Sequence, residues 1–229
     1  MDAQSPAPVP AQEARAAPRG VVGTSRAAIN AVFNGLALAI MALPAAMSAV
    51  EFRLAPERED IFVFWGQFAS LIPGIPGRYL RRAYYRMTLE RCTLDCDIGF
   101  MAWFSHRGGR VGHRVYIGPQ AIIGMATIDD GAMIGSRASV LSGTRQHRHG
   151  PDGRLEAFSL AAAQRVHIGH DAWIGEAALV MADVGAGAIV AAGAVVSSPV
   201  PEKVVVGGNP ARFVRRLAPD GDASRPAGT

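Results

Sequence analysis

The feature that most constrains the fold of this chain is a six-residue period of aliphatic residues in its C-terminal half. This period fits neither the 3.6-residue repeat of an amphipathic helix nor the alternation of a long β-hairpin. It is typical of hexapeptide repeats, in which three short strands and their turns form one triangular coil of a parallel β-helix. We therefore predict a mainly β chain of stacked coils over residues 91–205. The period is held by Ile122, Ile128, Ile134 and Val140, then by Ile168, Ile174 and Val180, and then by Val184, Val190 and Val196.

Isoleucine is followed directly by glycine six times between residues 98 and 175. We expect the isoleucine to point into the prism and the glycine to occupy a tight corner where a Cβ would be crowded. Each coil then contacts only its neighbours, and the core is a continuous aliphatic ladder. A β-sandwich with glycine turns would not hold the six-residue frame. The pairs begin at Ile98, Ile117, Ile123, Ile134, Ile168 and Ile174.

An uncharged segment covers residues 27–50, after a tail at 1–25 whose composition predicts disorder. The segment is long enough to cross the hydrocarbon core of a bilayer. Pro44 lies deep within it and would kink or break a helix there. Positive charges flank both ends, so the charge pattern gives no orientation. The segment could span a membrane, re-enter it, or pack as a buried helix.

A second apolar stretch begins at residue 61, and a turn at residues 73–77 separates it from a predicted helix. Arg78, Arg82 and Arg86 lie four residues apart and share one face of that helix. This pattern suits a helix lying in a lipid headgroup layer, and it suits a solvated cationic face equally well. We predict a membrane-associated helical region over 26–90, with membrane contact through 27–50 and 61–86.

Charge and cysteine content exclude several function classes. The net charge is +4, and the chain carries no zinc-finger, RNP or helix-turn-helix signature, so no nucleic acid partner is expected. The two cysteines, Cys92 and Cys96, are too few for a disulfide framework or a complete zinc site. We therefore expect no metal.

The six-residue frame stops after Val140 and resumes at Ile168. A long irregular loop inside a compact repeat is usually functional, so the insertion at 142–165 is the predicted catalytic loop. An imidazole with a pKa near neutrality can take the proton of an attacking alcohol. Four of the six histidines lie in this insertion or just after it: His147, His149, His167 and His170.

The segments VYIGPQAIIG, VHIGHDAWIG, AIVAAGAVV and GGNPARFVRR resemble the hexapeptide-repeat acyltransferases. The order D-A-W-I-G, A-A-G-A-V-V and G-N-P-A-R resembles the sugar and polysaccharide O-acetyltransferase branch, which includes maltose, galactoside and colanic-acid acetyltransferases. The resemblance covers about residues 90–217. It implies a left-handed parallel β-helix with an N-terminal apolar helical region and a short C-terminal helix. It also implies a homotrimer with active sites between subunits.

The resemblance assigns roles to individual residues. Alignment on the S-G-x-x-Q-H pattern makes His147 the general base, with His149 as the alternative. Asp152 or Glu156 would orient that base, and Trp173 would border the acceptor site. The co-substrate would be acetyl-CoA. The residues implied at the CoA groove are the backbone of Ala191, Ala192 and Gly193, the loop Gly208, Asn209, Pro210 and Ala211, and the phosphate contacts Arg212, Arg215 and Arg216.

The three C-terminal arginines suit equally the polar face of a capping helix within 206–229, a segment that would also hold the CoA loop and a disordered tail. The implied reaction is acetyl transfer to a hydroxyl of a sugar or lipid-linked saccharide in a cell-surface or exopolysaccharide precursor. Because CoA is cytoplasmic, the domain would lie at the cytoplasmic face of the inner membrane, or in the cytoplasm if residues 27–50 form only a buried helix. Alternatives are an antibiotic O-acetyltransferase, a non-catalytic β-helix scaffold and a zinc hydratase of the γ-carbonic anhydrase type.

Overall fold

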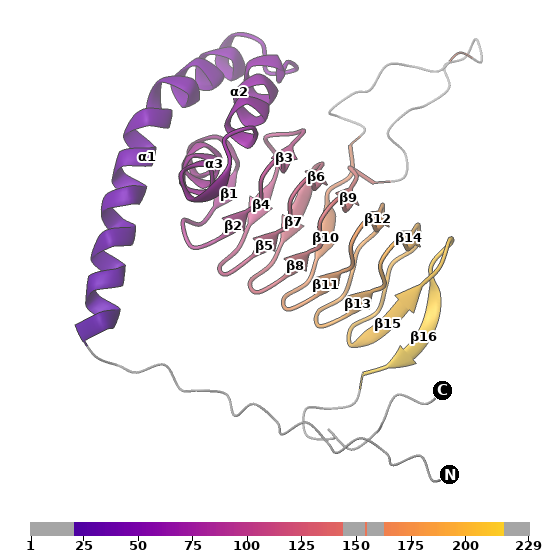
Figure 1. The fold of residues 1–229 in the computed structure, drawn as a ribbon. Coiled ribbons are helices and arrows are strands. Elements are labelled where there is room, and N and C mark those ends of the chain that lie inside the picture. The colour runs from indigo at the N-terminus through magenta and orange to yellow at the C-terminus, as the bar shows by residue number, and fades with distance from the viewer. Residues whose placement is uncertain (1–20, 144–153, 155–162, 218–229) are drawn as a thin grey trace.

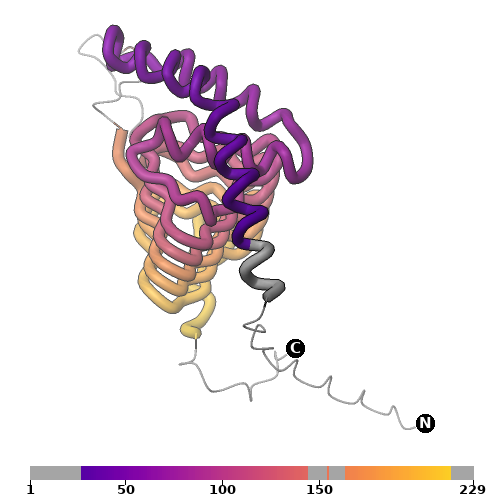
Figure 2. Tube along the Cα trace, turned by 90° about the vertical axis from the view of Figure 1, so that its left-hand side faces the viewer, coloured from indigo at the N-terminus to yellow at the C-terminus, as the bar shows by residue number. Residues whose placement is uncertain are grey.

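The computed structural model describes residues 21–143, 154 and 163–217. The predicted stacked coils are confirmed, since the chain forms a parallel β-solenoid of about five turns. Three helices lie at the end of the solenoid where the first coil begins, and α1 crosses that end in both views (Figures 1 and 2). We call these three helices the cap.

Each of the first four coils contributes one short strand to each of three sheets, A, B and C, and the strands within a sheet pair in parallel except for the last pair in sheet B (Figure 1). Sheet A holds β1 (Arg91–Cys92), β4 (Arg110–Val111), β7 (Ala126–Ile128) and β10 (Val166–Ile168). Sheet B holds β2 (Asp97–Ile98), β5 (Tyr116–Ile117), β8 (Met133–Ile134), β11 (Trp173–Ile174), β13 (Ile189–Val190), β15 (Val204–Gly207) and β16 (Arg212–Arg216). Sheet C holds β3 (Trp103–Phe104), β6 (Ile122–Ile123), β9 (Ser139–Val140), β12 (Leu179–Val180) and β14 (Val195–Val196).

The second residue of most strands points inward and is fully buried, which forms the predicted aliphatic ladder. The prediction was wrong for one residue of the six-residue frame. Ile122 faces outward with 39% of its surface exposed, and Ile123 takes the inward position. The cause is a shorter step at the next corner, because Ile128 follows Ile123 by five residues rather than six. The inward ladder of sheet B consists of Ile98, Ile117, Ile134, Ile174, Val190 and Val206.

The glycines that follow the ladder isoleucines are required by close backbone approach. A Cβ on Gly135 would lie 2.6 Å from the backbone nitrogen of Glu176 in the next coil. A Cβ on Gly175 would lie 2.4 Å from the nitrogen of Ala192. Neither glycine has a positive φ, so the space between coils excludes a side chain here, and backbone freedom is not the reason.

The cap contains α1 (Val21–Leu54), α2 (Asp60–Ser70) and α3 (Gly74–Thr88). Helix α1 begins at Val21, so the predicted boundary of the tail after residue 25 was wrong. The helix also continues through Pro44, which is buried. Packing of α1 against the other two helices outweighs the proline penalty of about 3 kcal/mol. Most of the predicted turn at residues 73–77 is helical instead, because α3 starts at Gly74. The helix accommodates Pro76 in its first turn, where no backbone donor is needed.

The arginines at 78, 82 and 86 do not form a free cationic face. Arg78 pairs with Asp97 of β2 at 3.0 Å. Arg82 is buried against α1, where its Nε donates to Asn34 at 2.9 Å and its guanidinium lies over the Tyr79 ring. The predicted headgroup contact by this row is therefore wrong for Arg82, whose charge is used inside the protein.

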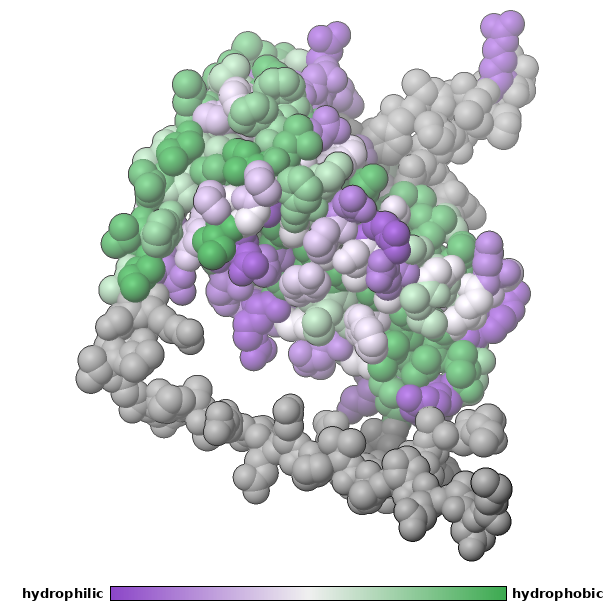
Figure 3. Space-filling model, viewed as in Figure 1, coloured by the Kyte–Doolittle hydropathy of each residue, from purple (hydrophilic) through white to green (hydrophobic). Residues whose placement is uncertain are grey.

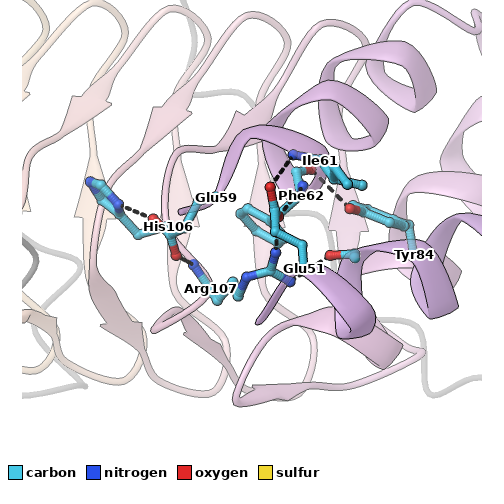
Figure 4. A network of polar contacts seen from close by, with 8 residues as sticks. Glu51, Glu59, Ile61, Phe62, Tyr84, His106 and Arg107 are labelled. Carbon is cyan, nitrogen blue, oxygen red and sulfur yellow. Dashed lines mark hydrogen bonds and ion pairs between the residues drawn. The ribbon is translucent and has the colours of Figure 1, made fainter. Parts of the chain in front are cut away.

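A polar network joins the cap to the first coil (Figure 4). The carboxylate of Glu51 accepts hydrogen bonds from the backbone N–H groups of Ile61 at 2.7 Å and Phe62 at 3.2 Å, which are free donors in the first turn of α2. The same carboxylate pairs with Arg107, which also bonds Ser48. Glu59 accepts from the Arg107 N–H at 2.8 Å and contacts His106 at 2.6 Å.

The C-terminal segment departs from the expected capping helix. Residues 212–216 form β16, which pairs antiparallel with β15 and closes the last edge of sheet B. The sequence RFVRR contains an aromatic and a β-branched residue, which suit a strand, and charged residues on an edge strand oppose further pairing. No helix follows α3 in the part of the chain that the structure describes.

Candidate active site

The insertion leaves the solenoid at the corner between sheets C and A, after β9 and before β10. Its base is closed by a hydrogen bond from the Gln164 N–H to the Ser142 carbonyl at 3.0 Å. Ser142 is buried, and its hydroxyl accepts from the Met125 N–H at 2.9 Å. Gly143 has a φ of +81°, a conformation that favours glycine. The two ends of the insertion are thus fixed between the third and fourth coils.

The predicted general bases and their orienting carboxylates lie outside the described residues. These residues are His147, His149, Asp152 and Glu156. The described structure gives the position of the loop's base only.

Trp173 stands on the outward side of β11, in register with Met133 on one side and Ile189 on the other. Just over half of its surface is exposed. Sheet B is the face opposite the corner from which the insertion leaves, because the chain passes from sheet A to B to C and then into the insertion. Within one chain, the base of the loop and Trp173 therefore lie on different sides of the prism.

The structure brings together the two segments expected at the CoA groove. Ala191–Gly193 turns from sheet B to sheet C, and Gly208–Ala211 lies beside it. The Val195 N–H donates to the Gly208 carbonyl at 2.9 Å, and the Ala211 N–H donates to the Val195 carbonyl at 2.8 Å. Asn209–Pro210 is a cis peptide bond within this turn.

The backbone amides of this turn differ in their availability. The Ala191 N–H donates to the Val206 carbonyl and the Gly193 N–H to the Glu176 carbonyl, each at 2.8 Å. Both are therefore used inside the solenoid, and the expectation that all three amides bind the co-substrate is wrong for these two. Among the described residues, no backbone acceptor faces the Ala192 N–H.

The arginines after this turn form an exposed basic edge. Arg212, Arg215 and Arg216 are all exposed on β16. No described carboxylate forms an ion pair with any of the three. Unpaired guanidinium groups on an exposed edge can bind phosphate oxygens in a bidentate manner.

A histidine–aspartate pair beside the insertion was missed by the sequence analysis. The Nε2 of His167 lies 2.7 Å from an Asp129 carboxylate oxygen, on the outward side of sheet A. The backbone N–H of His167 also donates to a carboxylate oxygen of Asp183 at 2.8 Å. The two members of the pair are 38 residues apart, so only the register of β10 on β7 brings them together.

The shifted pKa values among the described residues lie in the cap and first coils. Partial burial favours the neutral form of Glu90, but hydrogen bonds from Arg110 and Arg165 outweigh it and hold the pKa of Glu90 below its ordinary value. Burial lowers the pKa of Arg81, whose guanidinium donates to carbonyls at the end of α2 and to Ile98. A cavity of about 390 Å³ lies nearby, between Phe52, Met87 and Met125. These features belong to the junction of cap and solenoid, away from Trp173.

No group of three His, Cys, Asp or Glu side chains that could hold a metal ion is present in residues 21–143 and 163–217. Cys92 and Cys96 are both buried, with sulfur atoms 3.7 Å apart.

Comparison with known proteins identifies the fold. No protein-family model matches the chain, and no curated protein matches it. A maltose O-acetyltransferase from Clostridium difficile 630 has a TM-score of 0.61 at 18% identity, over 72% of this chain and 89% of its own. A hexapeptide-repeat acetyltransferase from Vibrio cholerae O1 biovar eltor, complexed with acetyl coenzyme A, has a TM-score of 0.57 at 22% identity, over 70% and 89%. A galactoside acetyltransferase in complex with coenzyme A has a TM-score of 0.53 at 18% identity, over 70% and 81%. The chain therefore has the parallel β-solenoid fold of the hexapeptide-repeat acetyltransferases.

Proposed function

We propose that this protein is an acetyl-CoA-dependent O-acetyltransferase that modifies a sugar hydroxyl in a cell-surface or exopolysaccharide precursor. The observation that carries the proposal is an insertion containing His147 and His149 in its sequence, whose two ends are fixed at one corner of an acetyltransferase-type solenoid. Two solved neighbours are a maltose O-acetyltransferase and a galactoside acetyltransferase, and two are complexes with acetyl coenzyme A or coenzyme A.

In the proposed reaction, His147 takes the proton of the acceptor hydroxyl as its oxygen attacks the thioester carbonyl. The new O–C bond forms, the C–S bond breaks, and the imidazolium returns the proton to the CoA sulfur. His149 is the alternative base, and Asp152 is the proposed orienting carboxylate. No acyl-enzyme is needed, because the loop supplies a base and the acceptor supplies the nucleophile. Trp173 would pack against the sugar.

The C-terminal end of the solenoid is the proposed CoA site. The Ala192 N–H is the amide of its turn that remains available for the pantetheine or thioester oxygen. Gly208, Asn209 and Pro210 would lie beside the adenine. Arg212, with Arg215 and Arg216, would bind the phosphates, since these guanidiniums are exposed and have no described carboxylate partner.

A homotrimer would complete the site. The loop leaves the corner between sheets C and A, whereas Trp173 stands on sheet B, so neighbouring prisms could bring one chain's loop to another chain's tryptophan. The outward rows support contact between prisms, because sheets B and C carry large apolar residues that face away from their own core. These include Tyr116, Met133, Trp173, Ile122 and Leu179.

We further propose that the protein works at the cytoplasmic face of the inner membrane on a lipid-linked saccharide. CoA is cytoplasmic, and α1 contains the 28-residue stretch Ala27–Leu54, in which an 18-residue window has a mean hydropathy of 1.7, so that by length and composition it could cross a membrane.

The test is the His147→Ala variant assayed with acetyl-CoA and sugar acceptors. We expect kcat to fall by about 10²–10⁴, with little change in acetyl-CoA binding, and the rise of kcat/KM through a pKa of about 6.5 to be lost. His149→Ala and His167→Ala are matched controls, and each is expected to cost much less. If none of the three variants slows transfer by about tenfold, the loop is not catalytic and the non-catalytic scaffold is favoured.

A further inference from the structure

Helix α1 has its polarity reversed relative to an ordinary surface helix. Its protein-facing positions recur at intervals of three and four residues, and several are polar or small. Asn30 accepts a hydrogen bond from Tyr79, Asn34 accepts one from Arg82, and Glu51 binds Arg107. The protein-facing positions are Asn30, Asn34, Ala37, Met41, Ala45, Ser48 and Glu51.

Eight large apolar side chains of α1 are exposed to solvent instead, whereas Met41 and the partly buried Leu38 face inward. Each of the eight exposes between 41% and 70% of its surface, and no charge interrupts residues 27–50. Contiguous exposed apolar surface of this kind marks an interaction site. The outward residues are Ile29, Val32, Phe33, Leu36, Ile40, Leu43, Met47 and Val50.

This apolar face continues beyond α1 (Figure 3). Phe64, Phe68 and Ile75 on α2 and α3 are also more than half exposed. Between α1 and α3 lies a crevice of about 170 Å³ whose lining is almost entirely apolar and includes Phe33, Leu36 and Ile75. The crevice has the chemistry of a site for part of an acyl chain.

The buried contacts of α1 argue against a transmembrane arrangement. Spanning would require α1 either to leave α3 or to carry its partners into the hydrocarbon core. Leaving would break the Glu51–Arg107 pair and leave the largely buried Arg107 side chain without its carboxylate partner. Carrying the partners along would place Arg82 and Arg107 inside the bilayer, which is costly.

We propose that α1 lies in the plane of a membrane surface, with its outward face in the lipid and its inward face on α3. The exposed Arg53 and Arg58 lie at the end of the apolar row with Glu57 between them, and no described residue pairs with either guanidinium. Each guanidinium can bind a lipid phosphate, while the exposed carboxylates of Glu57 and Asp60 on the same segment offset their charge. The proposal concerns attachment alone and does not depend on acetyl transfer.

A bilayer suits this face better than a second copy of the chain. In a pair of soluble helices, the edges of the contact remain in water and normally carry charges. Between residues 31 and 50 of α1, every position of the exposed arc is apolar or small, including Gly35, Ala39, Ala42 and Ala46. This arc is wider than one partner helix can cover, whereas lipid can cover all of it.

Flotation of the full chain with vesicles tests the attachment. We expect the protein to float with phosphatidylcholine vesicles, because the apolar face of α1 supplies most of the binding. Val32→Asp should weaken binding by at least about tenfold. The matched control is Val214→Asp at the far end of the solenoid, where the valine is 60% exposed against 70% for Val32. Equal binding by the two variants, or wild-type protein that never floats, would overturn the proposal.

Two further measurements separate the alternatives. Cysteine can be placed singly at Leu36, Leu43 and Val50 and labelled with a nitrobenzoxadiazole dye. Quenching by brominated lipids then measures the depth of each dye in the bilayer, and we expect the three depths to be equal and shallow. A graded depth along the helix would indicate spanning and contradict in-plane attachment. Sedimentation without lipid should give the same oligomer for wild type and Val32→Asp. A smaller oligomer for that variant alone would assign the face to a second copy and overturn the proposal.

Discussion

The cap and the solenoid hold their shape by opposite means. The solenoid repeats one small unit, and its interior is a ladder of aliphatic residues with backbone hydrogen bonds between coils. The cap has no such repeat: it packs on buried aromatic residues such as Phe62 and Tyr84, and a few polar groups, chiefly Glu51, Arg81 and their partners, join its helices to each other and to the first coil. The comparison indicates that the solenoid's stability is spread over many equivalent contacts, while that of the cap is concentrated in a few.

A pair of glycine substitutions should separate the two regions most strongly. Gly135→Ala would force a Cβ to within 2.6 Å of backbone in the next coil, and we expect a loss of about 4 kcal/mol or more in the free energy of unfolding. Gly35→Ala on α1 has no atom within 4 Å of the added Cβ and should raise helix stability by up to about 1 kcal/mol. Urea unfolding measures both values. Similar losses at the two sites would contradict the packing argument.

Removing one buried charge should damage the cap and spare the coils. In Glu51→Ala, Arg107 and two N–H groups of α2 lose their partner, and we expect a loss of about 3 kcal/mol or more. Hydrogen exchange should show faster opening of α1 and α2, with protection of sheet B unchanged. Glu51→Gln keeps an acceptor for α2 and should cost less. Uniform loss of protection throughout the chain would mean that cap and solenoid unfold as one unit.

Alkaline pH should weaken the cap by a smaller amount. Tyr84 is fully buried, and burial raises its pKa to about 12. Burial likewise raises the pKa of Tyr85, whose hydroxyl accepts from the Phe104 N–H. Since the unfolded pKa is about 10, the stabilising contribution of Tyr84 is complete below about pH 10, and about 2 kcal/mol of it is lost as pH rises to about 12. Unfolding measured across this range should show the fall, and Tyr84→Phe should reduce the fall without abolishing it, because Tyr85 still titrates.

The same contrast explains what the sequence could predict. The solenoid was predictable because the ladder residues are set by local spacing, and the error at Ile122 came from a single five-residue step. The cap network was not predictable, since Glu51, Glu59 and Arg107 are brought together only by tertiary packing. The polar inner face of α1 was not predictable for the same reason, because its partners lie on α2, on α3 and just after β3.

In the candidate site, too, the features set by the local repeat were predictable and those set by contacts between coils were not. The neighbouring turns at Ala191–Gly193 and Gly208–Ala211 follow from the repeat, as does the outward position of Trp173. The engaged amides of Ala191 and Gly193 depend on how the last coils stack, which spacing alone does not give. The same is true of the pairing of His167 with Asp129, which needs the register between two coils.

The stacking of the coils also fixes the distance between the cap and any residue of the solenoid to a whole number of coil spacings. Strands in a sheet lie about 4.8 Å apart, so Trp173 on β11, three strands along sheet B from β2, is about 14 Å from the first coil. The height of any residue above the cap can change only by whole coils, because each coil must keep its register with the next. Adding or deleting one coil between cap and insertion would move the candidate site by about 4.8 Å and leave its chemistry unchanged.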